Sequence, residues 1–377
     1  MYNDKTPHPF LWLIVLFVTL FTLLGYTVSA SSNTDGISAR AATLYQPDTG
    51  NFLFKKNSSK RLPMASTTKI MTAIIASERL SKNKIYEIMP EAVGIEGSSA
   101  YLKSGDMISG EELLYALLLQ SANDAAVAIA YHVSGGIEEF ANLMNDKVSQ
   151  LGLMNTHFTN PHGLDDENHY TTAEDLAVIS SELLSDPALS EIVSTYKKTF
   201  IGEGRQRTYV NHNKLLLKYD DTIGVKTGFT KKSGRCLVGA AERDGLRFIT
   251  VTLDAPNDWN DHKTLFDYGY KSLECLSLAK EGDFHYEIPV INGKESYLTV
   301  KNEQELSLIL PKTEREIEKC VKMHKYVIAP IYEGTKLGEV IFTDNGTELG
   351  RVSLISEKTV SSVKTKNIFE KIKDKLF

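Results

Sequence analysis

Three short motifs with reactive side chains stand in order along this chain, and they constrain its fold more than any other feature. They are Ser66-Thr67-Thr68-Lys69, Ser121-Ala122-Asn123 and Lys226-Thr227-Gly228. We expect the first motif at the start of a helix, the second in a loop between helices and the third at the end of a strand. Catalytic side chains usually lie at such positions. The chain must therefore fold so that these three distant segments meet around one cleft.

The pairing of Ser66 with Lys69 predicts nucleophilic catalysis. Residues three apart share one side of a helix, so the amine lies beside the hydroxyl. A serine hydroxyl is a weak nucleophile until a neighbouring base removes its proton. A lysine can act as that base only if its pKa falls, through burial or a nearby cation, which Lys226 could supply. The same spacing recurs elsewhere, for example at Ser81 and Ser277, but Lys-Thr-Gly occurs once.

The other motif residues complete the predicted site. Ser121 is placed to relay a proton between a lysine and the leaving amine, and Asn123 can hold Lys69 or a substrate amide. Lys226 and Thr227 can bind a substrate carboxylate by charge and hydroxyl.

Three further positions belong to the same prediction. Gly228 would let a substrate strand approach the edge of the sheet. The backbone N–H groups of Ser66 and Phe229 would form an oxyanion hole. His212 could line the carboxylate pocket, although a surface strand position is an equal alternative.

A second cluster of polar residues offers competing chemistry. His162, Asp165 and His169 could form a Ser/His/Asp triad with Ser66, or a metal site. The Pro- and Gly-containing stretch around them is more typical of a loop that borders a pocket, so we expect neither a triad nor a metal. Three cysteines, Cys236, Cys275 and Cys320, fit no zinc pattern and are expected to be buried free thiols.

The 377 residues allow two domains, and the net charge of −6 argues against nucleic acid as a partner. Residues 31–275 show strands, then helices, then strands, which predicts an α+β domain with one antiparallel sheet and helices packed around it. Residues 276–360 contain short runs in which apolar and polar residues alternate, separated by turns, and this pattern predicts a small all-β domain. The predicted helix over 259–275 precedes the boundary.

The N-terminal segment predicts export, and the C-terminal segment predicts attachment to a membrane. Residues 1–30 have the charged, apolar and small-residue order of a signal peptide, with an uncleaved anchor as the alternative. In residues 361–377 the apolar side chains share one helical face and lysines cover much of the rest, which predicts a basic amphipathic membrane anchor; a solvated tail is the alternative. The four apolar residues are Ile368, Phe369, Ile372 and Leu376.

From about residue 38 to 360 the chain resembles the D-alanyl-D-alanine carboxypeptidases, which are low-molecular-mass penicillin-binding proteins. The resemblance lies in five strings: Leu62–Lys69, Gln120–Ala126, Asn160–Leu164, His169–Ala173 and Gly224–Gly228. It implies a penicillin-binding transpeptidase-like fold, a β-rich domain and a C-terminal anchor. Some relatives carry Arg at the position of His212 and His at the position of Phe229, so the contacts there are expected to differ.

The resemblance also implies an activity. Ser66 would attack the penultimate carbonyl of peptidoglycan stem peptides that end in D-Ala-D-Ala, D-Ala would leave, and water would hydrolyse the acyl-enzyme. No metal or organic cofactor is implied, and β-lactams would acylate the same serine. A β-lactamase is the nearest rival; it needs a carboxylate to activate water, for which Glu167 is a candidate. An inert wall-binding scaffold is the non-enzymatic rival.

Overall fold

The computed structural model describes residues 36–202 and 205–363. The predicted signal peptide lies outside the described residues, as does the predicted anchor beyond Val363. In the described part of the chain no helix has both the length and the apolar composition needed to cross a membrane.

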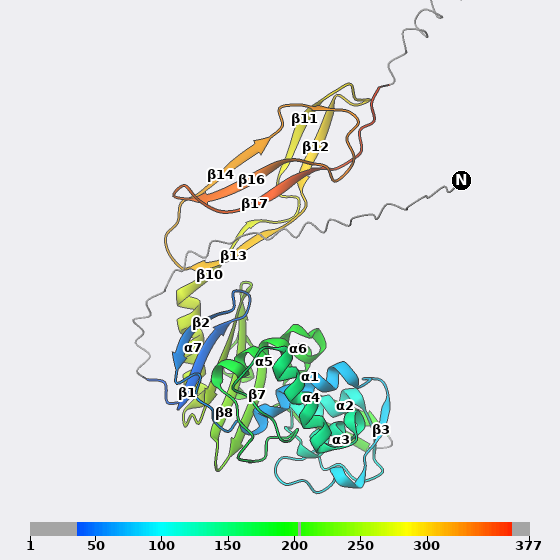
Figure 1. The fold of residues 1–377 in the computed structure, drawn as a ribbon, viewed down its shortest axis with the longest axis vertical. Helices are drawn as coiled ribbons and strands as arrows, with labels where there is room; N and C mark the ends of the chain where they lie inside the picture. Colours follow the sequence, from blue (N-terminus) through cyan, green and yellow to red (C-terminus); the bar gives the residue numbers. More distant parts are fainter. Residues whose placement is uncertain (1–35, 203–204, 364–377) are drawn as a thin grey trace, which may run out of the picture. The chain divides into compact units, whose positions relative to one another are not determined.

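One five-stranded antiparallel sheet, in the order β2-β1-β9-β8-β7, carries the first part of the chain (Figure 1). Its strands are β1 (Ala41–Gln46), β2 (Asn51–Lys56), β7 (Thr222–Thr230), β8 (Gly234–Arg243) and β9 (Leu246–Leu253). Pairing of β1 with β9 joins the N-terminal hairpin to the late strands, as the sequence predicted. Strand β7 lies at one edge of this sheet.

Helices cover both faces of the sheet because its strands are apolar on both sides. Val238 and Ile249 pack into the core with the central helices. Their chain neighbours Leu237 and Phe248 point the other way and pack against Phe266 of α7. The helices are α1 (Lys69–Arg79), α2 (Gly110–Leu118), α3 (Asn123–Ser134), α4 (Ile137–Gln150), α5 (Ala173–Ser185), α6 (Pro187–Ser194) and α7 (Asp258–Ser272).

Several short elements were not predicted. A turn of 3₁₀ helix, η1 (Ala65–Thr68), precedes α1, so Ser66 lies just before the α-helix. Two more 3₁₀ turns are η2 (Pro90–Ala92) and η3 (Lys214–Leu217), and η3 precedes β7. The small hairpins pair β3 (Ile85–Glu87) with β4 (Met107–Ser109) and β5 (Lys197–Gly202) with β6 (Arg205–Val210).

The later part of the chain is all β, as expected. Strand β10 (Leu273–Ala279) pairs with β13 (Leu306–Pro311), and a six-stranded sheet has the order β14-β16-β17-β12-β11-β15. The predicted helix over 259–275 was too long, because it ends at Ser272 and β10 begins at Leu273. The sheet strands are β11 (His285–Ile291), β12 (Tyr297–Asn302), β14 (Ile317–Met323), β15 (Val327–Ile328), β16 (Lys336–Asp344) and β17 (Thr347–Ser356).

One strand of this region was missed, and one expectation about the cysteines was wrong. Strand β14 was missed because nearly all of its side chains are exposed, so no alternation of apolar and polar residues marks it. The cysteines were expected to be buried, but only Cys236 is; Cys275 is half-buried and Cys320 is exposed.

At Gly163 the backbone of the 160–164 loop packs closely against the backbone of η1. A Cβ atom at Gly163 would lie 2.0 Å from the carbonyl oxygen of Ala65, and the residue has a φ of +90°. Glycine alone has neither the clash nor the strain of this conformation.

We therefore expect Gly163→Ala to lower the free energy of unfolding by about 2–4 kcal/mol, from backbone strain plus overpacking. Gly152→Ala is the matched control, since Gly152 also has a positive φ, +70°, but nothing within 4 Å of its Cβ position. That variant should lose about 1 kcal/mol, the strain alone. Denaturant unfolding measures both, and equal losses would show that the close approach is unimportant.

Candidate active site

The turn η1 places Ser66 and Lys69 side by side. The Nζ of Lys69 lies 3.1 Å from the Oγ of Ser66. Lys69 is completely buried, and it points inward from the first residue of α1. Nζ also lies 2.6 Å from Oδ1 of Asn123 and 2.6 Å from the carbonyl oxygen of His162.

Lys69 can make these three contacts in either protonation state, since a charged ammonium group could donate to all three oxygens. A neutral amine has two N–H donors and one lone pair. The oxygens of Asn123 and His162 have no proton to give, so they take the two donors. The lone pair then faces the hydroxyl of Ser66, which can donate to it. The geometry therefore suits proton transfer from Ser66 when Lys69 is neutral.

Electrostatics also favours the neutral form of Lys69. Burial lowers the pKa of Lys69 well below its usual value, and the nearby charge of Lys226 lowers it further, against a smaller opposing effect of Asp124. Burial alone lowers the pKa of Lys226 to about 7. Desolvation disfavours the charged form of any amine, and two adjacent buried cations disfavour each other.

The second motif organises the loop that faces Ser66. Ser121 adopts a φ of +60° between α2 and α3. The backbone N–H of Asn123 donates to the carbonyl of Ser98 at 2.7 Å. Asp124 accepts from the backbone N–H groups of Ala100 and Leu102. Asn123 and Asp124 thereby shape residues 96–102, which bring Ser98 into the cleft.

Gly228 allows β7 to lie against the nucleophile turn. A Cβ atom at Gly228 would be 3.0 Å from the backbone nitrogen of Ser66 and 3.1 Å from the carbonyl oxygen of Met64. The missing side chain therefore makes room for the Ser66 turn, and the expected room for a substrate strand stays a prediction. The next residue, Phe229, is 65% exposed.

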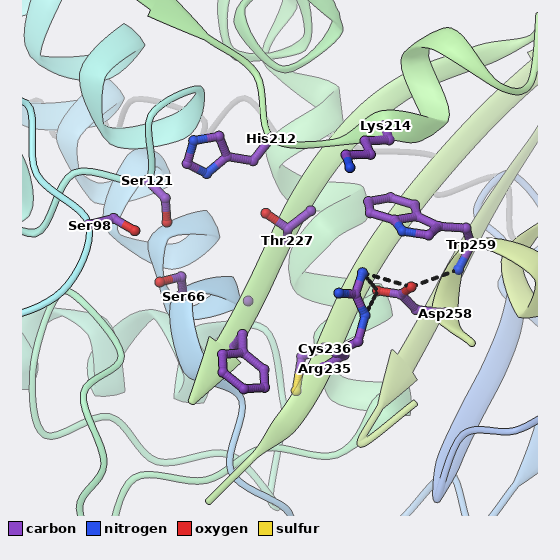
Figure 2. Close-up of a pocket in the computed structure, with 12 residues that line it drawn as sticks. Ser66, Ser98, Ser121, His212, Lys214, Thr227, Arg235, Cys236, Asp258 and Trp259 are labelled. Carbon is purple, nitrogen blue, oxygen red and sulfur yellow. Dashed lines mark hydrogen bonds and ion pairs between the residues drawn. The ribbon is translucent and has the colours of Figure 1, made fainter. Parts of the chain in front are cut away.

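A cavity of about 370 Å³ opens between these elements. Figure 2 shows the hydroxyl groups of Ser66, Ser98 and Ser121 turned toward one another on one side of it, with Thr227 opposite. The lining residues are Ser66, Ser98, Ser121, His212, Lys214, Thr227, Gly228, Phe229, Arg235, Cys236, Asp258 and Trp259. Every predicted site residue lines this cavity except Lys69, Asn123 and Lys226, which are buried behind it.

The sequence reasoning missed several lining residues, among them Ser98, Arg235 and Asp258. They belong to no motif and reach the cavity only through tertiary packing. Arg235 alone carried a signal, since it follows the turn after Lys-Thr-Gly and must pair with Phe229 if that turn is a hairpin.

The competing histidine site is not assembled. Nδ1 of His169 accepts from the backbone N–H of Thr159, and Nε2 lies 2.7 Å from Oγ1 of Thr68. Burial lowers the pKa of His169 to about 4 and that of His162 to about 3. Both ring nitrogens of His169 are thus engaged, Nε2 with Thr68 of η1 and Nδ1 with the backbone of Thr159. Among the described residues, no group of three His, Cys, Asp or Glu side chains could hold a metal ion.

Comparison with known proteins agrees with this geometry. The D-alanyl-D-alanine carboxypeptidase family, peptidase S11, matches residues 27–257, and the C-terminal domain of penicillin-binding protein 5 matches residues 274–362. The chain is 34% identical to D-alanyl-D-alanine carboxypeptidase DacF of Bacillus subtilis, covering 87% of this chain and 89% of the relative. It is 29% identical to DacC of Escherichia coli, covering 91% and 90%.

Solved structures show the same relationship. Penicillin-binding protein 5 of Haemophilus influenzae superposes with a TM-score of 0.62 at 28% identity, covering 86% of this chain and 98% of that one. The fold, the motif order and these matches agree, and the chain belongs to the D-alanyl-D-alanine carboxypeptidase family of serine-type penicillin-binding proteins.

Proposed function

We propose that Ser66 is the nucleophile with which this carboxypeptidase removes the terminal D-Ala from peptidoglycan stem peptides, and that Lys69 is its general base. One observation carries the assignment: the buried amine of Lys69 lies 3.1 Å from the Ser66 hydroxyl, and its other contacts are proton acceptors. That arrangement is what activates a serine without histidine.

The reaction follows from these positions. Lys69 takes the proton of Ser66 while Oγ attacks the penultimate carbonyl carbon. The backbone N–H groups of Ser66 and Phe229 stabilise the oxyanion, since Gly228 holds β7 against the Ser66 turn. Collapse of the intermediate expels D-Ala, whose amine receives a proton relayed by Ser121. Water then attacks the ester carbonyl while Lys69 takes a proton from it, and that proton passes to Oγ of Ser66 as the shortened peptide leaves. The amide of a β-lactam ring would acylate Ser66 by the same first step.

The β-lactamase alternative is less well supported. Glu167, the candidate to activate a deacylating water, is exposed and does not line the cavity. Nitrocefin turnover, measured beside D-Ala release, separates the two activities: slow nitrocefin turnover with rapid D-Ala release is the expected result.

The location of the enzyme is a further part of the proposal. A signal peptide in residues 1–30 would export the chain, and a basic amphipathic segment beyond residue 363 would hold it at an anionic membrane surface. Peptidoglycan stem peptides would then be within reach of the cleft.

For the general base, we predict that Lys69→Met lowers acylation by fluorescent penicillin by about 10²–10⁴-fold, the usual contribution of such a base. Methionine keeps most of the buried volume, so the fold should survive, as circular dichroism can check. Lys84→Met, at an exposed lysine, is the control and should acylate normally. Near-normal acylation of Lys69→Met would remove Lys69 from this role.

The pH dependence of acylation tests the same assignment. The neutral form of Lys69 is the reactive one, so the acylation rate should rise with pH as Lys69 loses its proton. Lys226 lowers the pKa of Lys69. We therefore expect residual acylation in Lys226→Met to rise at a higher pH than in the wild type. Lys214→Met, which removes a cation from the cavity wall, should leave the midpoint in place. An unmoved midpoint in Lys226→Met would contradict the coupling.

For membrane attachment, we expect deletion of residues 364–377 to release the protein from membranes while D-Ala release persists. Ser66→Ala in the full chain is the matched control, because it should stay on the membrane and lose activity. Cell fractionation combined with a D-Ala assay reads out both properties. Membrane retention of the deleted form would point to the N-terminal segment instead.

A further inference from the structure

The six-stranded sheet of the later domain carries an apolar surface on the strands β12, β11 and β15. Strands β11 and β15 run parallel, and Ile291 lies beside Ile328. In the antiparallel pair of β11 with β12, Tyr297 lies beside Pro289, which shares its face with Ile291 because it is two residues away. Tyr326 is two residues before Ile328 and is exposed like it. These five residues are called the apolar patch.

The apolar patch is open to solvent, although the other face of the same strands forms the core of the domain. Its four large side chains, those of the two isoleucines and the two tyrosines, are 43% to 60% exposed. Their chain neighbours Val290 and Val327 are buried in the core. Contiguous exposed apolar side chains often mark a contact surface for a protein or a membrane. The patch is therefore suited to contact with a partner outside the domain.

The chain leaves the described part of the domain beside this patch. The backbone N–H of Val363 donates to the carbonyl of Asn292 at 2.8 Å, and Asn292 directly follows Ile291. Ile368, the first apolar residue of the predicted anchor, is five residues beyond Val363. Five residues of extended chain span at most about 18 Å. A membrane that holds the predicted anchor would therefore lie within a short distance of the apolar patch.

The charged groups around the apolar patch fit an anionic surface. Lys294 and Lys325 are exposed at its border, one in the turn after β11 and one just before β15. Glu295 forms an ion pair with Lys358, so its charge is balanced. Glu287 is exposed on β11, farther from the turn where the chain leaves. Tyrosines and apolar side chains with lysines at their border are typical of surfaces that contact the headgroup region of a membrane.

We propose that the apolar patch is a second membrane contact, which enters the headgroup region of an anionic bilayer beside the predicted anchor. The inference rests on the membrane location proposed above and adds to it a surface of the β domain. Two contacts on one molecule bind more tightly than either alone, because the second forms at a high effective concentration. A second copy of this chain on the same face is the alternative occupant, and the oligomeric state distinguishes the two.

Binding to vesicles tests this contact. The protein is produced from the full-length chain, and its partition is measured on vesicles of equal parts phosphatidylglycerol and phosphatidylcholine. Combining Ile291→Ser with Ile328→Ser should weaken partition by about 10- to 50-fold, because both apolar side chains are lost from the bilayer contact. The control combines Ile317→Ser with Val321→Ser, two exposed positions of β14 at the opposite edge of the same sheet, and should bind normally. Unchanged partition of the first variant would overturn the proposal.

Tryptophan fluorescence locates the apolar patch itself. The sequence has two tryptophans, Trp12 in the predicted signal peptide and Trp259, so the background is low. On vesicles, the emission of Tyr326→Trp should move to shorter wavelength and be quenched by brominated lipid. Val321→Trp on β14 should show neither change. If Tyr326→Trp stays unquenched in vesicle-bound protein, the patch does not touch the membrane and the predicted anchor acts alone.

Deletion of residues 364–377 separates the two contacts. The shortened protein should keep weak vesicle binding, and the two isoleucine substitutions should abolish it; residual binding that ignores them would contradict the proposal. A wild type that binds no vesicles would remove both the membrane location and the patch contact. A wild-type dimer that the isoleucine substitutions convert to a monomer, with vesicle binding intact, would assign the face to a second copy. D-Ala release from a soluble peptide should be equal in all variants, so the carboxypeptidase reaction is judged separately.

Discussion

The burial of the Lys69 amine is the interaction on which the rest of the site depends. An amine without water needs polar partners, and a buried one without them is destabilising by several kcal/mol. Here the partners come from three separate segments: Ser66 beside it, Asn123 from α3 and the carbonyl of His162. The hydrogen bonds of the Lys69 amine therefore hold these three segments together around the cavity.

A second lysine makes the neutral state of the first more favourable. Lys226 is buried as completely as Lys69, and burial lowers the pKa of each. Placing two amines behind the cavity suits proton transfer, because each can lose its charge. It suits anion binding less well, because an amine that loses its charge attracts an anion less strongly.

Much of the fold could be predicted, because the spacing of apolar residues along a segment shows whether that segment forms a helix or a strand. The N-terminal hairpin, the helices from α1 to α5 and the strands from β7 to β9 follow from that periodicity and from Gly-containing turns. Exposed strand β14 has no alternation and was missed, and the end of α7 was misjudged because apolar residues continue from Leu273 into β10. Strands β3 and β4 have three residues each, too few to show a periodic pattern. Strands β5 and β6 are longer, but Tyr209 is their only buried side chain.

The sequence by itself determined the chemistry: a serine and a lysine one turn apart, a Ser-x-Asn loop and a single Lys-Thr-Gly strand indicate serine acyl transfer. Spacing within a motif is local and can be read from the residues. Only the tertiary structure decided which groups remain open to a ligand. It buried Lys226, lowered the pKa of His212, packed Gly228 against the Ser66 turn and paired Arg235 with Asp258. Burial and cross-strand register arise from contacts between distant segments, so no local pattern records them.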